Sequence, residues 1–140
     1  MSKGSILIVE DVHLIRNTLR ARLGEEGYEV ATAGSVSEAL QAVRSQTPGL
    51  IILDLTVYDD QDPIASLSDG FAFLTLVRMN YTYKGPAVVI YTATKSPQVE
   101  AKAKSLRAVA VIEKTAGFEA LLGAIREAFE QQNSGSPTTA

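Results

Sequence analysis

The sequence LIILD, residues 50–54, decides the fold of this chain. Four apolar residues follow one another without a polar interruption, directly after the chain-breaking pair Pro48 and Gly49. A strand that is apolar on both faces is typical of the centre of a parallel sheet covered by helices on both sides. The run ends at Asp54, and open parallel sheets bind their ligands just outside the carboxyl ends of the strands. LIILD therefore predicts a central strand and a candidate site residue together.

Three further apolar runs end in residues that carry chemistry: Glu10 and Asp11 after ILIV (6–9), Thr92 after AVVIY (87–91), and Lys114 after VAVIE (109–113). The carboxyl ends of parallel strands meet at one edge of a sheet, so these residues are expected to converge with Asp54. Asp11 and Asp54 would supply two carboxylates there, beside a hydroxyl and an ammonium. That combination indicates a site for a divalent cation and a phosphoryl group.

Strand patterns alternate with amphipathic helical patterns along the chain. Strands are expected at 5–9, 28–33, 50–53, 87–91 and 108–112, and helices at 12–26, from Ser35 or Ser37 onward, and at 70–79, 96–106 and 118–129. Five such repeats argue for a parallel sheet with right-handed crossovers. The predicted fold is α/β, a flavodoxin-like (βα)5 three-layer sandwich whose five-stranded parallel sheet has the order 2-1-3-4-5.

The length of 140 residues predicts one domain, residues 1–130, followed by a polar tail at 131–140 that is expected to be a disordered segment or linker. A net charge of −3 gives no electrostatic reason to expect nucleic-acid binding. The sequence contains no run of about eighteen apolar residues, so it predicts no membrane span. The lack of cysteine and of a signal-peptide pattern at the start is compatible with a cytoplasmic protein.

Residues 55–69 are expected to be irregular, with Ser68 or Asp69 capping a helix that starts at Gly70. Gly70 lies sixteen positions after Asp54, whereas a connection between strand and helix usually has about 2–6 residues. We expect this loop to cover the site or to meet a partner, with a mobile insertion as the alternative. Within it Tyr58 is expected to pack on the domain, and three aspartates are expected to face solvent: Asp59, Asp60 and Asp62.

The acidic pair, the lone Asp54, Thr92 followed by the small Ala93, and Lys114 resemble the receiver domain of two-component response regulators. The resemblance covers about residues 5–130. It implies a phosphorylation-controlled signalling switch in which Asp54 accepts a phosphoryl group from a histidine kinase or a histidine phosphotransfer protein. The chain would then be a phosphoacceptor and not an enzyme, with at most self-catalysed phosphoryl transfer and autodephosphorylation.

The resemblance also implies a ligand set for Mg²⁺, a hard cation that proteins hold with one or two carboxylates and phosphate oxygens. Asp11 and Asp54 would be direct ligands, the backbone carbonyl of Thr56 would be a third, and Glu10 would act through water. Lys114 would pair with Asp54 before the reaction and with a phosphoryl oxygen after it.

In the same way, Thr92 would donate its hydroxyl to the incoming phosphoryl group. An output partner would bind the surface made by the fourth helix, the fifth strand and the fifth helix, and a homodimer is left open.

Three positions depart from the family, and the first is Gly70, which lies farther from Asp54 than is usual in the family. Val111 stands where the family often has an aromatic switch residue, and Thr115 stands where a proline commonly follows the lysine. Without proline we predict a trans bond between Lys114 and Thr115. These departures leave the phosphoacceptor chemistry unchanged but keep open an alternative function, a phosphorylation-independent protein-interaction module with a receiver fold. A phosphatase with an aspartyl-phosphate would need a second acid two residues after Asp54, and Thr56 occupies that position.

Each site residue also has a structural interpretation when it is taken alone. Asp11 could cap the first helix, Asp54 could be a solvated turn residue, and Lys114 could be a surface lysine. The only histidine, His13, is expected to be exposed in the first turn of a helix. Three lysines of the fourth helical region are expected to form a solvated face: Lys95, Lys102 and Lys104.

Overall fold

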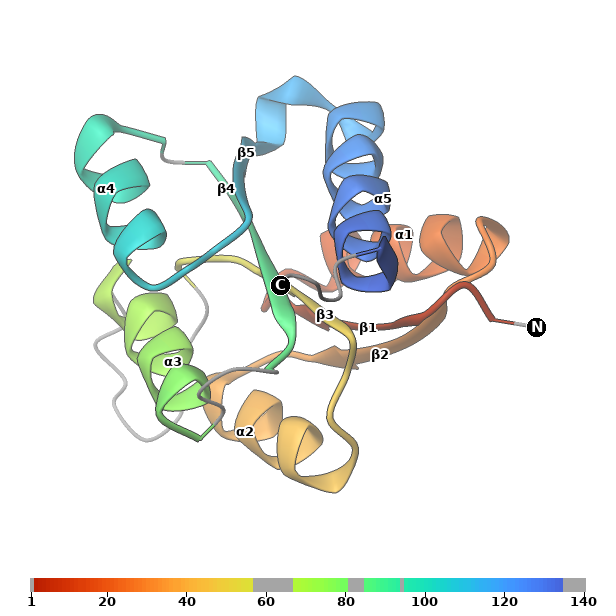
Figure 1. Ribbon diagram of the computed structural model, residues 1–140, viewed down its shortest axis with the longest axis horizontal. Helices are drawn as coiled ribbons and strands as arrows, with labels where there is room; N and C mark the ends of the chain where they lie inside the picture. The colour runs from red at the N-terminus through yellow and green to blue at the C-terminus, as the bar shows by residue number, and fades with distance from the viewer. Residues whose placement is uncertain (1, 57–66, 81–84, 94, 135–140) are drawn as a thin grey trace.

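The computed structural model describes residues 2–56, 67–80, 85–93 and 95–134 (Figure 1). The elements in order are β1 (Ser5–Val9), α1 (His13–Glu25), β2 (Glu29–Ala33), α2 (Val36–Ser45), β3 (Leu50–Leu53), α3 (Leu67–Asn80), β4 (Ala87–Thr92), α4 (Pro97–Ser105), β5 (Ala110–Glu113), the short 3-10 helix η1 (Lys114–Ala116) and α5 (Phe118–Ser134). The strands are parallel and lie in the order β2-β1-β3-β4-β5. This confirms the predicted flavodoxin-like fold and strand order.

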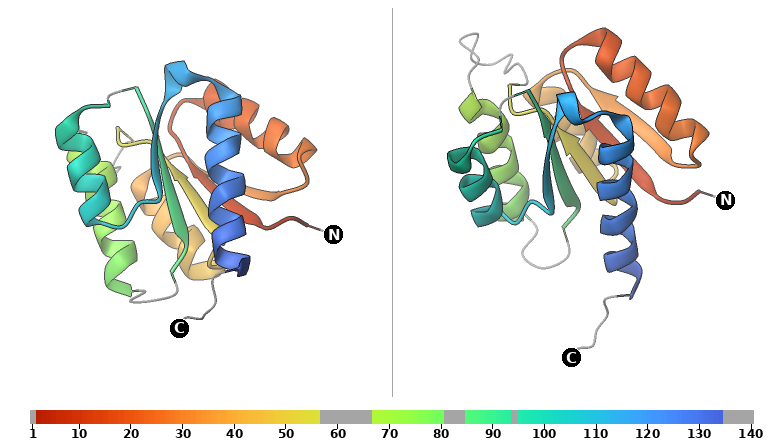
Figure 2. Two further views of the ribbon diagram at one scale, coloured as in Figure 1. Left: turned by 45° about the horizontal axis from the view of Figure 1, so that its top comes forward. Right: turned by 90° about the horizontal axis from the view of Figure 1, so that it is seen from above.

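Helices cover both faces of the sheet (Figures 1 and 2). α1 and α5 lie on one face, and α2, α3 and α4 lie on the other. The central strand β3 contributes Ile51 and Leu53 to the core beneath α2, α3 and α4, and Leu50 and Ile52 to the core beneath α1 and α5. All four are at most 2% exposed, which confirms the prediction from LIILD. Among the described helices, none is long and apolar enough to span a membrane.

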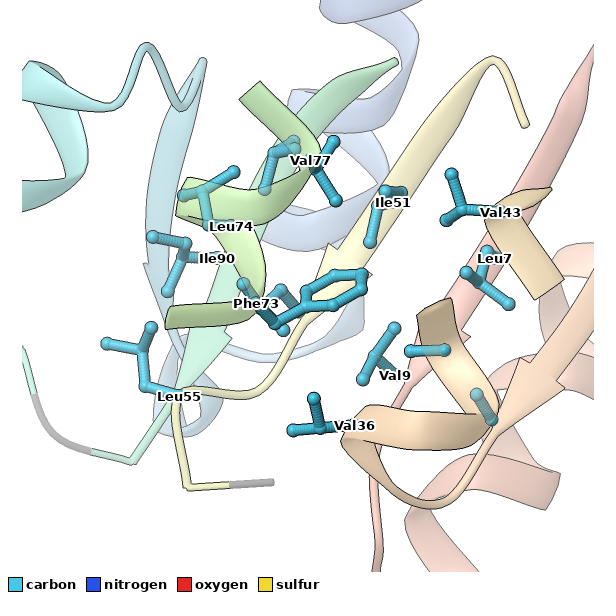
Figure 3. Packing of buried hydrophobic residues seen from close by; sticks show 14 of the residues in the cluster. Leu7, Val9, Val36, Val43, Ile51, Leu55, Phe73, Leu74, Val77 and Ile90 are labelled. Carbon is cyan, nitrogen blue, oxygen red and sulfur yellow. The ribbon is translucent and has the colours of Figure 1, made fainter. Parts of the chain in front are cut away.

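The core beneath α2, α3 and α4 fixes the position of α3. Figure 3 shows the fully buried ring of Phe73, from α3, among side chains of β1, β3 and α2 that include Val9, Ile51 and Val36. A ring of this size excludes water from a large apolar area, so its burial stabilises α3 against the sheet. The helix is therefore held close to the end of β3, where Asp54 lies.

The start of α3 corrects the prediction for residues 55–69. The helix begins at Leu67, so a start at Gly70 with a cap at Ser68 or Asp69 is wrong. The first four N–H groups of a helix lack partners inside the helix, and the fourth here, on Gly70, donates to the carbonyl of Leu55 at 3.2 Å. α3 thus begins against the residue that follows Asp54, whatever lies between them. The predictions for 57–66, including those for Tyr58, Asp59, Asp60 and Asp62, lie outside the described residues.

Two strands begin later than predicted because the preceding helix uses the N–H groups. Tyr28 donates its N–H to Leu23 in the closing turn of α1, and β2 starts at Glu29 instead of residue 28. Likewise Ala108 donates to Ala103 at the end of α4, and β5 starts at Ala110. The predicted end of α1 near Gly27 is confirmed by its positive φ of 103°, a conformation that glycine adopts readily.

The last helix is longer than predicted. α5 continues to Ser134, through the first part of the segment predicted as a disordered tail. Tertiary contacts explain the difference, because the ring of Phe129 stacks on Tyr28 with 5.4 Å between centroids. One helical turn further, the side-chain amide of Gln132 donates to the carbonyl of Gly49 at 2.9 Å. These contacts tie the end of α5 to the amino-terminal edge of the sheet.

Candidate functional site

The site forms where β1 and β3 end side by side. Val9 and Leu53 are partners in the parallel register, so Glu10 and Asp54 are the next residues on neighbouring strands. The N–H of Asp54 donates to the carbonyl of Val9 at 3.0 Å, which continues the pairing by one residue. Glu10, Asp11 and Asp54 each offer a carboxylate oxygen, and these three atoms lie within 4.8 Å of one another. The predicted convergence of the acidic residues is therefore confirmed.

Lys114 joins this cluster from the end of β5, the outermost strand of the sheet on that side. Its Nζ lies 2.8 Å from Oε1 of Glu10 and 3.2 Å from Oδ2 of Asp54. The side chain of Lys114 is 19% exposed, whereas those of Glu10 and Asp54 are 2% and 4% exposed. The contact with Asp54 confirms the predicted pair, and the shorter contact with Glu10 was not predicted. Three carboxylates and one ammonium leave a formal charge of −2, which favours a divalent cation.

Burial changes the proton affinity of these groups. It raises the pKa of Glu10 from 4.5 to about 7, with a smaller rise from the charge of Asp54, while the hydrogen bond from Lys114 opposes the shift. Burial alone would lower the pKa of Lys114, but the hydrogen bond to Glu10 and the charge of Asp54 raise it above its ordinary value. Lys114 is therefore charged at neutral pH and is the counter-charge of the cluster.

Asp11 is not a helix cap. The residue that precedes α1 is Val12, and no side chain caps that helix end. The N–H of Val12 is instead accepted by the second carboxylate oxygen of Glu10 at 3.2 Å. Within the described part of the chain, the carboxylate of Asp11 has no hydrogen-bond or ion-pair partner. Asp11 is half-buried and free to serve as a ligand, which overturns the capping interpretation.

Thr56 orients the Asp54 carboxylate. Its N–H and its hydroxyl donate to Oδ1 of Asp54 at 3.2 and 3.1 Å. The other oxygen, Oδ2, accepts from Lys114, so each oxygen of this carboxylate has its own donor. The prediction gave Thr56 a role only through its backbone carbonyl and missed the hydroxyl. The sequence did signal the N–H contact, because an aspartate commonly accepts a hydrogen bond from the backbone two residues later, but that rule does not cover the hydroxyl.

Of the remaining predicted positions, Thr92 and Thr115 lie at the same carboxyl edge of the sheet, and Val111 lies within β5. Thr92 is fully buried at the end of β4, opposite Glu113 of β5 in the register. Thr115 lies in η1, and its bond to Lys114 is trans, as predicted, because no cis peptide occurs in the described ranges. Val111 is half-buried and packs against the core beneath α2, α3 and α4.

The residues expected at the surface are there. His13 is exposed in the first turn of α1, where its Nδ1 lies 2.6 Å from a guanidinium nitrogen of Arg16. Lys95, Lys102 and Lys104 are exposed as well.

A parallel sheet in this order, with an acidic cluster and a lysine at its carboxyl edge, agrees with the family match. The sequence model of the family described as "Response regulator receiver domain" matches residues 6–126. The chain belongs to this family. Receiver domains act in two-component systems as phosphorylation-controlled switches and in general are not enzymes. They bind Mg²⁺ in an acidic pocket, and the carboxylates of this receiver domain fit such a hard cation.

The receiver domain is similar in sequence to transcriptional regulators. It is 43% identical over 51 residues to the transcriptional regulatory protein AfsQ1 of Streptomyces coelicolor, covering 36% of this chain and 23% of AfsQ1. It is 41% identical over 59 residues to the alginate biosynthesis regulator AlgB of Pseudomonas putida, covering 42% of this chain and 13% of AlgB. The matched segment thus spans less than a quarter of either relative.

Solved structures agree with the fold. The CheY-like receiver domain protein of Methanospirillum hungatei superposes with a TM-score of 0.80 at 26% identity, covering 94% of this chain and 98% of that chain. NtrX of Brucella abortus superposes with a TM-score of 0.78 at 26% identity, covering 95% of this chain and 27% of that chain. One neighbour is therefore a receiver domain of similar length, and the other carries the same fold within a longer chain.

Proposed function

We propose that Asp54 accepts a phosphoryl group from a histidine kinase or a histidine phosphotransfer protein and thereby switches the surface of this domain. The observation that carries the proposal is the placement of Asp54. The side chain of Asp54 is buried in a cluster of three carboxylates, with one oxygen held by Thr56 and the other by Lys114. A carboxylate held in this way is oriented for in-line attack on phosphorus.

In the proposed reaction, a carboxylate oxygen of Asp54 forms a bond to phosphorus. The bond from phosphorus to the donor's imidazole nitrogen breaks, and its electron pair stays on that nitrogen. The ring carries a proton on its other nitrogen, so it leaves as a neutral imidazole. The product is an acyl phosphate on Asp54 and a neutral histidine on the donor. Mg²⁺, when bound, neutralises charge on the phosphoryl oxygens. Asp11, Asp54 and the backbone carbonyl of Thr56 would hold it, with Glu10 acting through water.

Two further side chains would respond to the phosphoryl group. Lys114 already reaches an Asp54 oxygen at 3.2 Å, so it would transfer that hydrogen bond to a phosphoryl oxygen. Thr92 ends the strand next to β3 and would donate its hydroxyl to another. The next element after Thr92 is α4, which begins at Pro97 and is capped by the hydroxyl of Ser96, which accepts the N–H of Val99 at 3.1 Å. A shift of Thr92 would therefore be passed to the start of α4.

The output would be read on the surface of α4, β5 and α5. This receiver domain would act in the cytoplasm, where the kinase delivers the phosphoryl group. A homodimer formed through the surface of α4, β5 and α5 is compatible with this function. AfsQ1 and AlgB are much longer than the segment that matches this chain. What the whole protein does in response to phosphorylation is therefore also part of the proposal. We assign no nucleic-acid contact to this domain, since its net charge is −3.

A second candidate function, phosphorylation-independent protein interaction, is favoured by one observation. Val111 is packed against the core and has no ring to swing inward when Thr92 moves. A domain of this kind would bind its partner equally well with and without a phosphoryl group. Binding of an isolated partner to phosphorylated wild type and to Asp54→Asn separates the two functions, since only a switch binds them with different affinity.

The phosphorylation itself is tested by intact-mass measurement after incubation with Mg²⁺ and a small acyl-phosphate or phosphoramidate donor. Wild type should gain one phosphoryl group, and a chelator should suppress the gain. Asp54→Asn should gain none. Undiminished modification of that variant would overturn the assignment of Asp54.

A further inference from the structure

Arg16 connects the acidic cluster to its surroundings, although it is not a member of the cluster. It lies in the early part of α1 and is half-buried. Its Nη1 donates to the backbone carbonyl of Glu10 at 3.0 Å. Its Nη2 lies 2.6 Å from Nδ1 of His13, and because a guanidinium only donates, that ring nitrogen is the acceptor. Both arms of the guanidinium fork are therefore engaged.

The same guanidinium lies against the turn between β2 and α2. A Cβ built on Gly34 would collide with Nη1 of Arg16, so the two segments are in direct contact there. The turn is itself fixed, because Glu38 accepts the N–H of Gly34 at 2.8 Å and Ser35 accepts the N–H of Glu38 at 3.2 Å. Arg16 is thus held between a rigid turn and the end of β1.

The carbonyl that Arg16 binds belongs to the peptide group that joins Glu10 to Asp11. The N–H of Glu10 donates to Ala33 at 3.0 Å, so both backbone polar groups of Glu10 have fixed partners. Rotation of this peptide would redirect the side chains on either side of it. These are the carboxylate that meets Lys114 and the carboxylate of Asp11. Partners of this kind, one bond removed from a ligand, commonly determine how well a metal is bound.

We propose that Arg16 is a positioning residue of the cation site, which orients the Glu10–Asp11 peptide so that both carboxylates face the cation. The proposal rests on the proposed function, since it assumes that Mg²⁺ binds at this cluster. The role needs a planar fork, because one arm holds the carbonyl of Glu10 while the other is held by His13. A lysine has the charge but not the fork, so it fills the role only in part.

The first test compares Arg16→Met with Arg20→Met by calorimetric titration with Mg²⁺. Arg20 is exposed one turn further along α1, and methionine keeps the unbranched stem and the helix propensity in both variants. Arg16→Met should raise the Kd for Mg²⁺ by about tenfold, the low end for partners of metal ligands. Arg20→Met should stay within about twofold of wild type, and Arg16→Lys should lie between the two.

A kinetic readout separates positioning from general loss of structure. The rate of phosphorylation by a small donor should need more Mg²⁺ in Arg16→Met but reach the wild-type rate at saturation. A variant that was merely misfolded would lose the maximal rate too. Urea unfolding without Mg²⁺ shows whether each variant is folded.

A second variant approaches the contact from the other side and keeps the arginine. Gly34→Ala places a methyl group where Nη1 lies, which displaces the end of a flexible side chain and leaves the backbone undisturbed. Its matched control is Gly24→Ala, also a glycine-to-alanine change, where nothing lies within 4 Å of the added Cβ. Gly34→Ala should weaken Mg²⁺ binding severalfold, and Gly24→Ala should not. This comparison decides the matter if Arg16→Met does not fold.

The outcomes separate the two proposals. If wild type binds Mg²⁺ and Arg16→Met and Gly34→Ala bind it as well as their controls do, the role of Arg16 is overturned and the proposed function stands. If wild type neither binds Mg²⁺ nor accepts a phosphoryl group, the proposed function fails, and the role of Arg16 fails with it.

Discussion

The ammonium of Lys114 lies 2.8 Å from a carboxylate oxygen of Glu10, a residue 104 positions earlier in the chain. The contact is shorter than the one to Asp54, at 3.2 Å, so the lysine is shared between two buried carboxylates. Removing Lys114 would leave both carboxylates buried without their counter-charge, which destabilises a protein strongly. The apo site is thus held together by one cation from the chain itself.

The raised pKa of Glu10 predicts how stability depends on pH when divalent cations are absent. Between pH 4.5 and about 7 the unfolded chain has lost this proton and the folded protein still holds it. Stability should therefore fall as pH rises through this range, by an amount on the order of 3 kcal/mol. Glu10→Gln, which cannot ionise, should lack this loss. Urea unfolding with a chelator at pH 5 and pH 7.5 measures it, and equal pH trends in both proteins would contradict the prediction.

Lys114→Met should destabilise the apo protein by about 2–4 kcal/mol at pH 7.5, because two buried carboxylates lose their counter-charge. Mg²⁺ should recover much of this loss, since a bound cation supplies the missing charge. Lys102→Met, on the exposed face of α4, is the matched control and should change stability by less than about 0.5 kcal/mol. Unfolding curves with and without Mg²⁺ provide the comparison. An Mg²⁺ effect no larger in Lys114→Met than in wild type would count against the account.

Two glycine substitutions should have opposite effects. A Cβ on Gly70 would lie 2.6 Å from the Cα of Leu55 and 2.8 Å from its carbonyl oxygen, and backbone cannot move aside cheaply. Gly70→Ala should therefore destabilise the domain by about 1–3 kcal/mol. A Cβ on Gly123, in α5, meets nothing within 4 Å, and alanine should stabilise that helix by about 0.5–1 kcal/mol. Thermal unfolding of both variants checks the prediction, and equal shifts would refute it.

The fold could be predicted from the sequence because its main signal is local. The uninterrupted apolar run of 50–53 requires cover on both faces, and the alternation of strands and helices then leaves few topologies. Parallel topology also explains why the site was predictable. Residues at strand ends meet whatever the loops do, so Asp11, Asp54 and Lys114 were brought to one place.

The parts that could not be predicted depend on contacts between distant segments. α3 starts early because a carbonyl at Leu55 satisfies an N–H of its first turn, and α5 ends late because Phe129 and Gln132 are held by the sheet edge. Neither contact leaves a periodic signal in the sequence. The sequence did not indicate the proposed role of Arg16 for the same reason. Its partner is the backbone carbonyl of Glu10, and every residue type has such a carbonyl.

The most direct test of the central claim is to locate the phosphoryl group chemically. The domain is phosphorylated with Mg²⁺ and a small phosphodonor and then treated with borohydride, which reduces an acyl phosphate to an alcohol. Peptide mass spectrometry reads the position of the product. The account predicts homoserine at position 54 in the phosphorylated sample and in no sample that lacked Mg²⁺ or the donor. Homoserine at Asp11 or at any other acidic residue, with Asp54 unchanged, would contradict it.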